Sequence, residues 1–374
     1  MGDYGKVVTG NTPPTKDSEN YENGTYLWAS PADLGTIKSI TETKTMLSAQ
    51  GFSKTRTLPK GSVLVTCIGS TIGKAGMATK EMSTNQQINS IVVNDNNDNE
   101  FVYYAIQSAF PRYLSSIAVQ AVPIISKSAF ELLPNNRPYL QEQKKIGKFL
   151  SMLDERIATQ NKIIDKLQSL IKGSMAELQK VGAEGGTWKK VFLSEVLTER
   201  NEHNTNLYQV FSVSVSQGVV NQVDYLGRSF AAKDTSKYNV AHYGDLVYTK
   251  SPTGSFPYGI VKQSLNSQKV AVSPLYGVYV PNSLAVGVYL HEYFMSEINT
   301  HNYLHPLIQK GAKNTINITN QRFLENCVLL PININELLQI SKLLRSLNNK
   351  IKYQQDILQQ YHKQKQYLLR QMFI

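Results

Sequence analysis

The sequence lacks several features that mark common classes of protein. Its 374 residues include only two cysteines, Cys67 and Cys327, and these lie in apolar runs far apart. We therefore expect two buried thiols, not a disulfide or a metal pair. No apolar run approaches the roughly 20 residues that a membrane helix needs. The N-terminal segment has no apolar signal-peptide core, so we expect a cytoplasmic protein without a membrane partner.

A phosphate-binding loop is also lacking. The segment GSTIGKAG (69–76) resembles one, but only three residues separate Gly69 from Gly73, and Ala75 stands where Ser or Thr is required. Nucleotide hydrolysis is therefore not expected. A glycine-rich loop that follows a strand and carries a lysine remains able to meet a DNA phosphate or a base edge.

Other catalytic patterns are incomplete. The segments TPPT (12–15) and NRPY (136–139) resemble an adenine-methyltransferase signature only superficially, and no Gly-x-Gly loop follows a strand. His301 and His305 are four residues apart, but no glutamate lies beside His301 and no third ligand is evident, so no metal site is expected. We predict a chain that is not an enzyme and holds no cofactor of its own.

The charge is strongly basic but unevenly placed. The formal net charge is +11, which suggests an acidic partner such as nucleic acid. Residues 1–141 carry 12 basic and 11 acidic side chains, and residues 181–330 carry 12 and 10. By contrast, residues 331–374 carry seven basic and two acidic side chains. DNA recognition by the two large regions must therefore rest on local basic patches.

The chain repeats itself with an offset of 194 residues. Under this shift IGKFLSMLDERI (146–157) falls on ISKLLRSLNNKI (340–351). Further upstream, at a shorter offset, GSVLVTC (61–67) resembles GDLVYTK (244–250). A period of this length is that of a domain, not of a solenoid. The predicted architecture is a domain at 1–138, a helix at 139–182, a second domain at 183–330 and a second helix at 331–374.

Both helical segments carry a heptad pattern of apolar residues. Two helices with such stripes are expected to pair with each other, antiparallel, as a coiled coil, and a helix of ~39 residues would be ~58 Å long. The alternative is that each helix packs on its own domain. The residues expected to pair are Ile146, Leu150, Leu153, Ile157 and Gln160 in the first helix and Ile340, Leu344, Leu347, Ile351 and Gln354 in the second.

Both domains read as α+β, with short strands, polar turns and a few helices. In the first, Ser128 and Glu131 form a capping-box pattern. In the first domain, strands are also predicted at 62–69 and 88–95, followed by a helix at 101–118 that contains Pro111. In the second domain, a single helix is expected over about 290–309.

Polar loops after strands are the candidate DNA contacts. TNQQIN (84–89) places amides beside a strand, and KSPTGSFPYG (250–259) occupies the equivalent place in the second domain. Amides can bond adenine, and Arg or Lys can bond guanine, in the major groove. An ordinary structural turn explains each segment equally well. The candidate DNA-binding residues are Lys54, Arg56, Ser70, Thr71, Lys74, Asn85, Gln86, Gln87, Lys250, Ser251, Thr253, Ser255, Tyr258, Lys313 and Asn314.

Several stretches together resemble the specificity subunit of type I restriction–modification systems. The first domain opens with GKVVTGNTPPTKDSENYENGTYLWASPADL (5–34), continues with LPKGSVLVTCIGSTIGKAGM (58–77) and leads into the helix through PIISKSAFELLPNNRPYLQEQKK (123–145). WKKVFLSEVLTERNEHN (188–204) resembles the start of a second recognition domain. The first half has no Trp-led opening like that at Trp188, so we expect a few residues of that element to be missing.

The resemblance implies a division of labour. Each recognition domain would read one half of a bipartite, asymmetric sequence in double-stranded DNA, and the paired helices would set the spacing and dock two methyltransferase subunits, in a pseudo-twofold arrangement. Those subunits would bring S-adenosylmethionine and flip an adenine. Restriction and translocase subunits would use ATP. The alternative is a non-catalytic interaction scaffold whose helices recruit protein partners.

Overall fold

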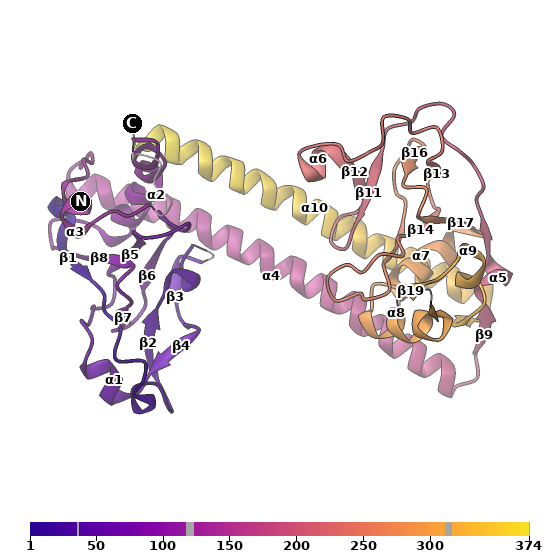
Figure 1. Cartoon of the computed structure of the whole chain (residues 1–374), viewed down its shortest axis with the longest axis horizontal. Helices are drawn as coiled ribbons and strands as arrows, with labels where there is room; N and C mark the ends of the chain where they lie inside the picture. The colour runs from indigo at the N-terminus through magenta and orange to yellow at the C-terminus, as the bar shows by residue number, and fades with distance from the viewer. Residues whose placement is uncertain (36, 117–122, 311–315, 374) are drawn as a thin grey trace. The chain divides into compact units, whose positions relative to one another are not determined.

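The computed structural model describes residues 1–35, 37–116, 123–310 and 316–373, and it divides the chain into two compact units. Unit 1 is Met1–Asn161 with Asp356–Ile374, and unit 2 is Lys162–Gln355. Two long helices, α4 (Leu140–Glu184) and α10 (Ile334–Met372), each contribute to both units (Figure 1). They lie within about three residues of the helices predicted at 139–182 and 331–374.

Unit 1 is built on a five-stranded sheet in the order β1-β8-β5-β6-β3. The first four strands are antiparallel neighbours, and β3 runs parallel to β6. A smaller sheet has the order β4-β2-β7. The strands are β1 (Gly5–Thr9), β2 (Tyr26–Ala29), β3 (Ser39–Ile40), β4 (Thr45–Leu47), β5 (Val63–Thr66), β6 (Ala75–Ala78), β7 (Ser83–Thr84) and β8 (Ile88–Val93).

Helices cover one face of this sheet. Helix α2 (Asn99–Ser116) contains Pro111 and is preceded by Asp98, whose side chain accepts a hydrogen bond from the backbone N of Phe101 at 2.9 Å. Its Phe101, Tyr104 and Phe110 are buried in one core with the sheet. The other helical segments of unit 1 are η1 (Gly2–Tyr4), η2 (Ser18–Asn20), η3 (Pro31–Asp33), α1 (Ala49–Ser53) and α3 (Lys127–Leu132).

The predicted cap of α3 was wrong by two residues. The hydroxyl of Ser126, not that of Ser128, accepts from the backbone N of Ala129 at 3.2 Å. Both serines lie near the helix start, and the extended backbone at Ser126 decides which one caps it. Ser128 instead lies within the first turn.

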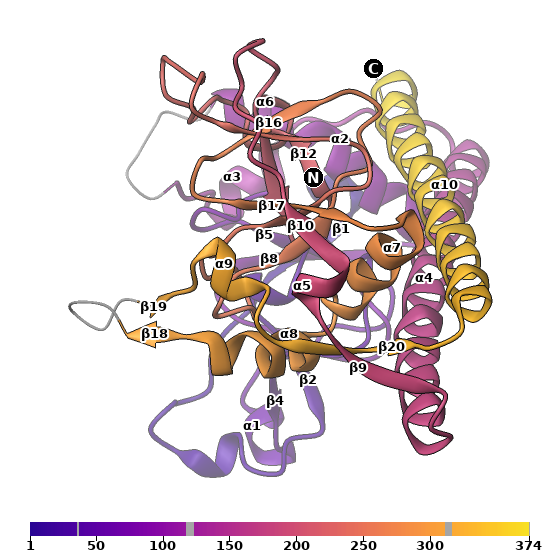
Figure 2. The ribbon, with the colours of Figure 1, turned by 90° about the vertical axis from the view of Figure 1, so that its right-hand side faces the viewer.

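Unit 2 contains a four-stranded antiparallel sheet in the order β10-β17-β14-β15. Further strand pairs are β11-β12, β13-β16 and β18-β19. Strand β9 pairs antiparallel with β20 (Figure 2). The strands are β9 (Trp188–Phe192), β10 (Leu197–Glu199), β11 (Phe211–Ser214), β12 (Gly218–Asn221), β13 (Asn239–Ala241), β14 (Leu246–Tyr248), β15 (Val261–Gln263), β16 (Val270–Val272), β17 (Gly277–Pro281), β18 (Gln309–Lys310), β19 (Ile316–Asn317) and β20 (Cys327–Pro331).

The helix expected at about 290–309 is two helices. Helix α7 ends before Phe294, which is buried, and Ser296 starts α8 by accepting a hydrogen bond from the backbone N of Asn299 at 3.3 Å. The serine competes with the continuing helix for backbone donors. The helical segments of unit 2 are α5 (Leu193–Val196), α6 (Gln222–Leu226), α7 (Leu284–Tyr293), α8 (Glu297–Leu304), η4 (His305–Leu307) and α9 (Asn320–Phe323).

The two units repeat one topology. Replacing β1, β8, β5 and β6 by β10, β17, β14 and β15 preserves both the strand order and every antiparallel pairing. The predicted match of 61–67 with 244–250 falls on β5 and β14, the third strand of each sheet. This agreement confirms the α+β fold class and the internal repeat.

The apolar stripes of the long helices pack both against the other long helix and against the domain core, which are the two arrangements considered above. In unit 1, Leu150 of α4 belongs to the domain core, and so does Phe373, which directly follows α10. The carboxylate of Asp154 on α4 accepts from Lys365 of α10 at 2.6 Å. The start of α4 therefore packs with the end of α10, as antiparallel helices do. Of the residues predicted to pair, Leu150, Leu153, Gln160, Ile340, Leu344 and Ile351 are buried, and Ile146, Ile157, Leu347 and Gln354 are half-buried.

Both cysteines are free thiols. Cys67 is buried, and this burial raises the pKa of its thiol to about 12, whereas Cys327 is only half-buried. None of the helices in the described part of the chain is long and apolar enough to cross a bilayer.

Candidate nucleic-acid interface

In unit 1 the hairpin between β5 and β6 carries the glycine-rich segment 67–74. The backbone N of Gly73 donates to the carbonyl of Thr66 at 3.0 Å and closes the loop. Gly73 has a φ of 89°, and a Cβ there would lie 2.7 Å from a ring carbon of Phe110, so the position requires glycine. The loop is therefore held in one shape. Of its predicted contacts, Ser70 and Lys74 are exposed and Thr71 is half-buried.

The amide-rich turn lies against this loop. The backbone N of Cys67 donates to the carbonyl of Gln87 at 2.8 Å. Asn85 is 7% exposed, its Oδ1 accepts from the backbone N of Gln87 at 3.0 Å, and its Nδ2 donates to Gln87 Oε1 at 3.0 Å. Gln86 is exposed, and its Oε1 accepts from the hydroxyl of Thr12 at 2.5 Å. Asn85 thus shapes the turn that presents Gln86.

Lys54 and Arg56 join the same surface through a segment that the sequence did not single out. The guanidinium of Arg56 donates to the carbonyl of Thr9 at 2.8 Å, and Lys54 forms an ion pair with Asp17 at 3.0 Å. Segment 9–12 therefore links Arg56 to the turn at Gln86. Its Gly10 and Asn11, followed by Pro13 and Pro14, are the signal that could have found it.

Unit 2 has a loop at the equivalent place, between β14 and β15. Lys250 adopts a φ of 60°, unusual for a residue with a side chain, and a Cβ on Gly259 would lie 2.8 Å from its backbone N. Burial lowers the pKa of the half-buried Lys250 ammonium. Strained backbone of this kind gathers at functional loops. Of the other predicted contacts, Ser251 and Ser255 are exposed, and Thr253 and Tyr258 are half-buried.

Helix α8 and the turn that follows it border this loop. The rings of His301 and His305 are stacked with centroids 5.2 Å apart, and they lie 5.3 and 5.9 Å from the ring of Tyr258. The hydroxyl of Ser255 donates to Glu297 at 2.5 Å. The two histidines, considered above only as metal ligands, are therefore part of the loop surface. In the described ranges, no three His, Cys, Asp or Glu side chains are grouped to hold a metal ion.

The remaining candidates cannot be placed. Lys313 and Asn314 lie outside the described residues. The structure thus brings the unit 1 candidates together on one edge, and it collects those of the 250–259 segment on one loop of unit 2. Whether any of them contacts a base or a phosphate stays a prediction.

Comparison with known proteins finds relatives for part of the chain. Residues 1–169 match the family described as "Type I restriction modification DNA specificity domain". The first part of the chain is therefore similar to a type I DNA specificity domain. The HindI specificity subunit of Haemophilus influenzae is 28% identical over 46% of this chain and 39% of its own length. The MjaIX specificity subunit of Methanocaldococcus jannaschii is 30% identical over 44% of this chain and 40% of its own length.

These matches extend over about 40% of the relatives they concern, whereas the likeness of fold covers nearly the whole chain. The type I S subunit of M. genitalium superposes with a TM-score of 0.60 at 13% identity, over 99% of this chain and 96% of its own. A chain from a study of type I R-M complex assembly and conformational transition gives 0.50 at 15% identity, over 97% and 96%. At these identities the likeness shows the fold alone.

Proposed function

We propose that this chain is the DNA specificity subunit of a type I restriction–modification complex. Each unit would read one half of a bipartite target. The observation that carries the proposal is the repeat of one strand order with a fixed polar loop at the same hairpin of each sheet. Because the loops at 67–74 and 249–260 differ in sequence and length, the two half-sequences would differ, and the target would be asymmetric.

In unit 1 the base-reading role is best assigned to Gln86 and Arg56, which are exposed on one edge and held by neighbouring polar groups. An amide can pair with adenine and a guanidinium with guanine. Lys74 would contact a phosphate, which positions the duplex without specifying its sequence. In unit 2 the corresponding surface is formed by Ser251, Ser255 and the ring of Tyr258.

The chemistry would belong to partners. Two methyltransferase subunits would dock on the long helices and bring S-adenosylmethionine, and restriction and translocase subunits would supply ATP-driven cleavage. The chain itself would select the DNA sequence and carry out no catalysis. The named relatives are each described as a specificity subunit, which supports this division.

The proposal is tested by DNA binding of the assembled complex of this chain with its methyltransferase subunits. The binding constant for the target should exceed that for a scrambled duplex by at least about 10³, and it should fall steeply with salt as counterions are released. Equal affinity for all sequences would refute sequence selection and would favour a protein-interaction scaffold, the second candidate function.

Substitutions in the two units should affect recognition of different halves of the target. Gln86→Ala should relax base choice in one half-sequence only, at a cost of about 1–3 kcal/mol for that base pair. Ser255→Ala should affect only the other half. Lys44→Ala removes an exposed positive charge from a loop of unit 1 and is the matched control. It should lower affinity slightly for every sequence alike.

A further inference from the structure

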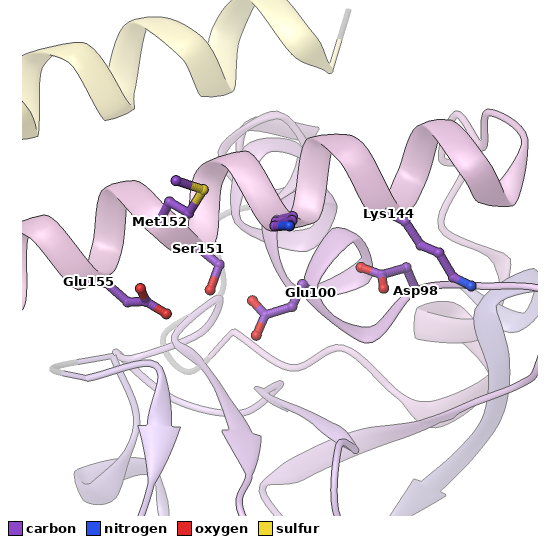
Figure 3. A pocket seen from close by; sticks show the side chains of 7 residues that line it. Asp98, Glu100, Lys144, Ser151, Met152 and Glu155 are labelled. Carbon is purple, nitrogen blue, oxygen red and sulfur yellow. The ribbon is translucent and has the colours of Figure 1, made fainter.

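Each unit contains a groove at the same place in its fold. In unit 1 the groove has a volume of about 340 Å³ and lies between the first turn of α2 and α4 (Figure 3). In unit 2 a groove of about 660 Å³ lies between the first turn of α7 and α10. Both α2 and α7 follow the second strand in the order of their sheets, β8 and β17, so the walls of the two grooves are topologically equivalent.

The equivalence extends to single residues. The residues of α4 that line the unit 1 groove are Lys144, Lys148, Ser151, Met152 and Glu155. An offset of 194 places Leu338, Lys342, Arg345, Ser346 and Asn349 at these positions, and all five line the unit 2 groove. The two helix starts also correspond, because Asp98 caps α2 and Ser283 caps α7.

Two features are common to both grooves. A lysine stands at the shared position, Lys148 or Lys342, and a large apolar side chain follows it in the sequence. Phe149 is 46% exposed and Leu343 is 49% exposed. Apolar side chains this exposed, at the same position in both repeats and beside a groove, indicate a surface that a partner covers.

The remaining chemistry of the grooves is unequal. Asp98, Glu100 and Glu155 bring three carboxylates to the unit 1 groove, two of them facing α4 across the opening (Figure 3). Lys144 and Lys148 also line the unit 1 groove, and Lys38 forms an ion pair with Glu100 at 2.7 Å, so three cations balance its three carboxylates. In unit 2, Asn349 replaces Glu155 and Ala285 stands in the first turn of α7, so no carboxylate in the lining opposes the two cations Lys342 and Arg345. Leu284 and Leu338 make the unit 2 groove more apolar as well.

We propose that the grooves seat the same segment of two copies of the methyltransferase subunit, and that the unit 2 groove binds it more tightly. This inference rests on the proposed function. The segment must suit what the grooves share, so it carries an apolar side chain for the position beside Phe149 or Leu343 and a carboxylate for Lys148 or Lys342. An acidic segment meets three carboxylates balanced by three lysines in unit 1, whereas the lining of unit 2 offers it two cations and no carboxylate.

The expected difference in affinity is about tenfold or more, because each exposed charge pair changes binding only modestly and several differ here. Raising the salt concentration should weaken the tighter site more than the weaker one, since its attraction is less opposed by repulsion. Assembly would therefore pass through a complex with one methyltransferase subunit on unit 2.

The test is a titration of the full chain with the methyltransferase subunit of the same system, followed by calorimetry and native mass spectrometry. Lys342→Glu should weaken the first binding step at least about tenfold, and Lys148→Glu should weaken the second. The pair Arg345→Ser and Asn349→Glu installs the unit 1 residues in unit 2 and should bring the two affinities together. Lys166→Glu, exposed on α4 outside both grooves, is the matched control. Urea unfolding of each variant checks that it is folded.

Two sites of equal affinity, with no loss of affinity in Lys342→Glu, would overturn the inference while leaving the proposed function intact. A dimer of this chain that Lys342→Glu dissociates would also overturn it, since the groove would then seat a second copy. If the subunit does not bind at all and the DNA binding is unselective, the proposed function itself fails.

Discussion

Asp154 should be the residue that couples the long helices to the core of unit 1. One of its oxygens accepts from Lys365 of α10 at 2.6 Å, and the other accepts from the hydroxyl of Tyr104 of α2 at 2.6 Å. The side chains of Asp154 and Lys365 are each 18% exposed, and Tyr104 is buried. Asp154→Ala would therefore leave a buried hydroxyl and a mostly buried ammonium without this partner.

Hydrogen bonds to a charged group contribute about 1.5–3 kcal/mol each, and Lys365 is able to regain part of its hydration. We expect Asp154→Ala to lower the free energy of unfolding of unit 1 by about 3 kcal/mol. Tyr104→Phe removes only one of the two bonds and should cost about 1.5 kcal/mol. Glu155→Ala, the exposed neighbour on the same helix, should change stability by less than about 0.5 kcal/mol.

The two tryptophans allow the stability of unit 1 to be measured separately. Trp28 lies in unit 1 and Trp188 in unit 2, so in a Trp188→Phe background the fluorescence change during urea unfolding reports on unit 1 alone. A double-mutant cycle of Asp154→Ala with Lys365→Met isolates their coupling. A cost for Asp154→Ala no larger than that for Glu155→Ala would refute the view that this carboxylate fastens the helices to the domain.

Three further predictions concern local features. Gly73→Ala should destabilise unit 1 by about 2 kcal/mol in the same urea assay, because the position has a positive φ and the added Cβ would clash with Phe110. Gly173 lies inside α4 with open space around it, so Gly173→Ala should stabilise unit 2 by up to about 1 kcal/mol. Burial lowers the pKa of Lys262 to about 8, so its contribution to stability is lost as the pH falls from 10.5 through 8. Lys262→Met should therefore reduce the gain in unit 2 stability between pH 7 and 9.5 by about 2 kcal/mol, measured by urea unfolding of a Trp28→Phe background. An equal pH dependence in both proteins would contradict the assignment of the shift to Lys262.

The architecture was accessible from the sequence because its signals are periodic. The heptad stripes located α4 and α10, and the resemblance of 61–67 to 244–250 paired β5 with β14 before any coordinates. The break between α7 and α8 was missed because the apolar pattern continues across Phe294, while a single serine hydroxyl ends the helix. Local competition of this kind leaves little trace in a pattern of apolar residues.

The sites were less accessible because they join residues that are distant in the sequence. Lys38, for example, donates to Glu100 at 2.7 Å and to Ser151 at 2.9 Å, a set that no local pattern connects. Asn85 carried the right chemistry for a base contact, yet its amide is used within its own turn. The paired grooves did have a signal in the offset between α4 and α10, but only the packing shows which face of each helix stays open.

The proposed function depends most on one idea, namely that the paired helices would set the spacing between two DNA-reading units. Its most direct test inserts one heptad after Asn161 in α4 and one after Gln355 in α10, where each helix passes between units. Seven residues add ~10.5 Å of helix, which corresponds to about three base pairs at ~3.4 Å each. Mapping of methylated adenines in cells should then find both half-sequences unchanged and the gap between them longer by about three base pairs. Altered half-sequences, or methylation at the original spacing, would contradict the account.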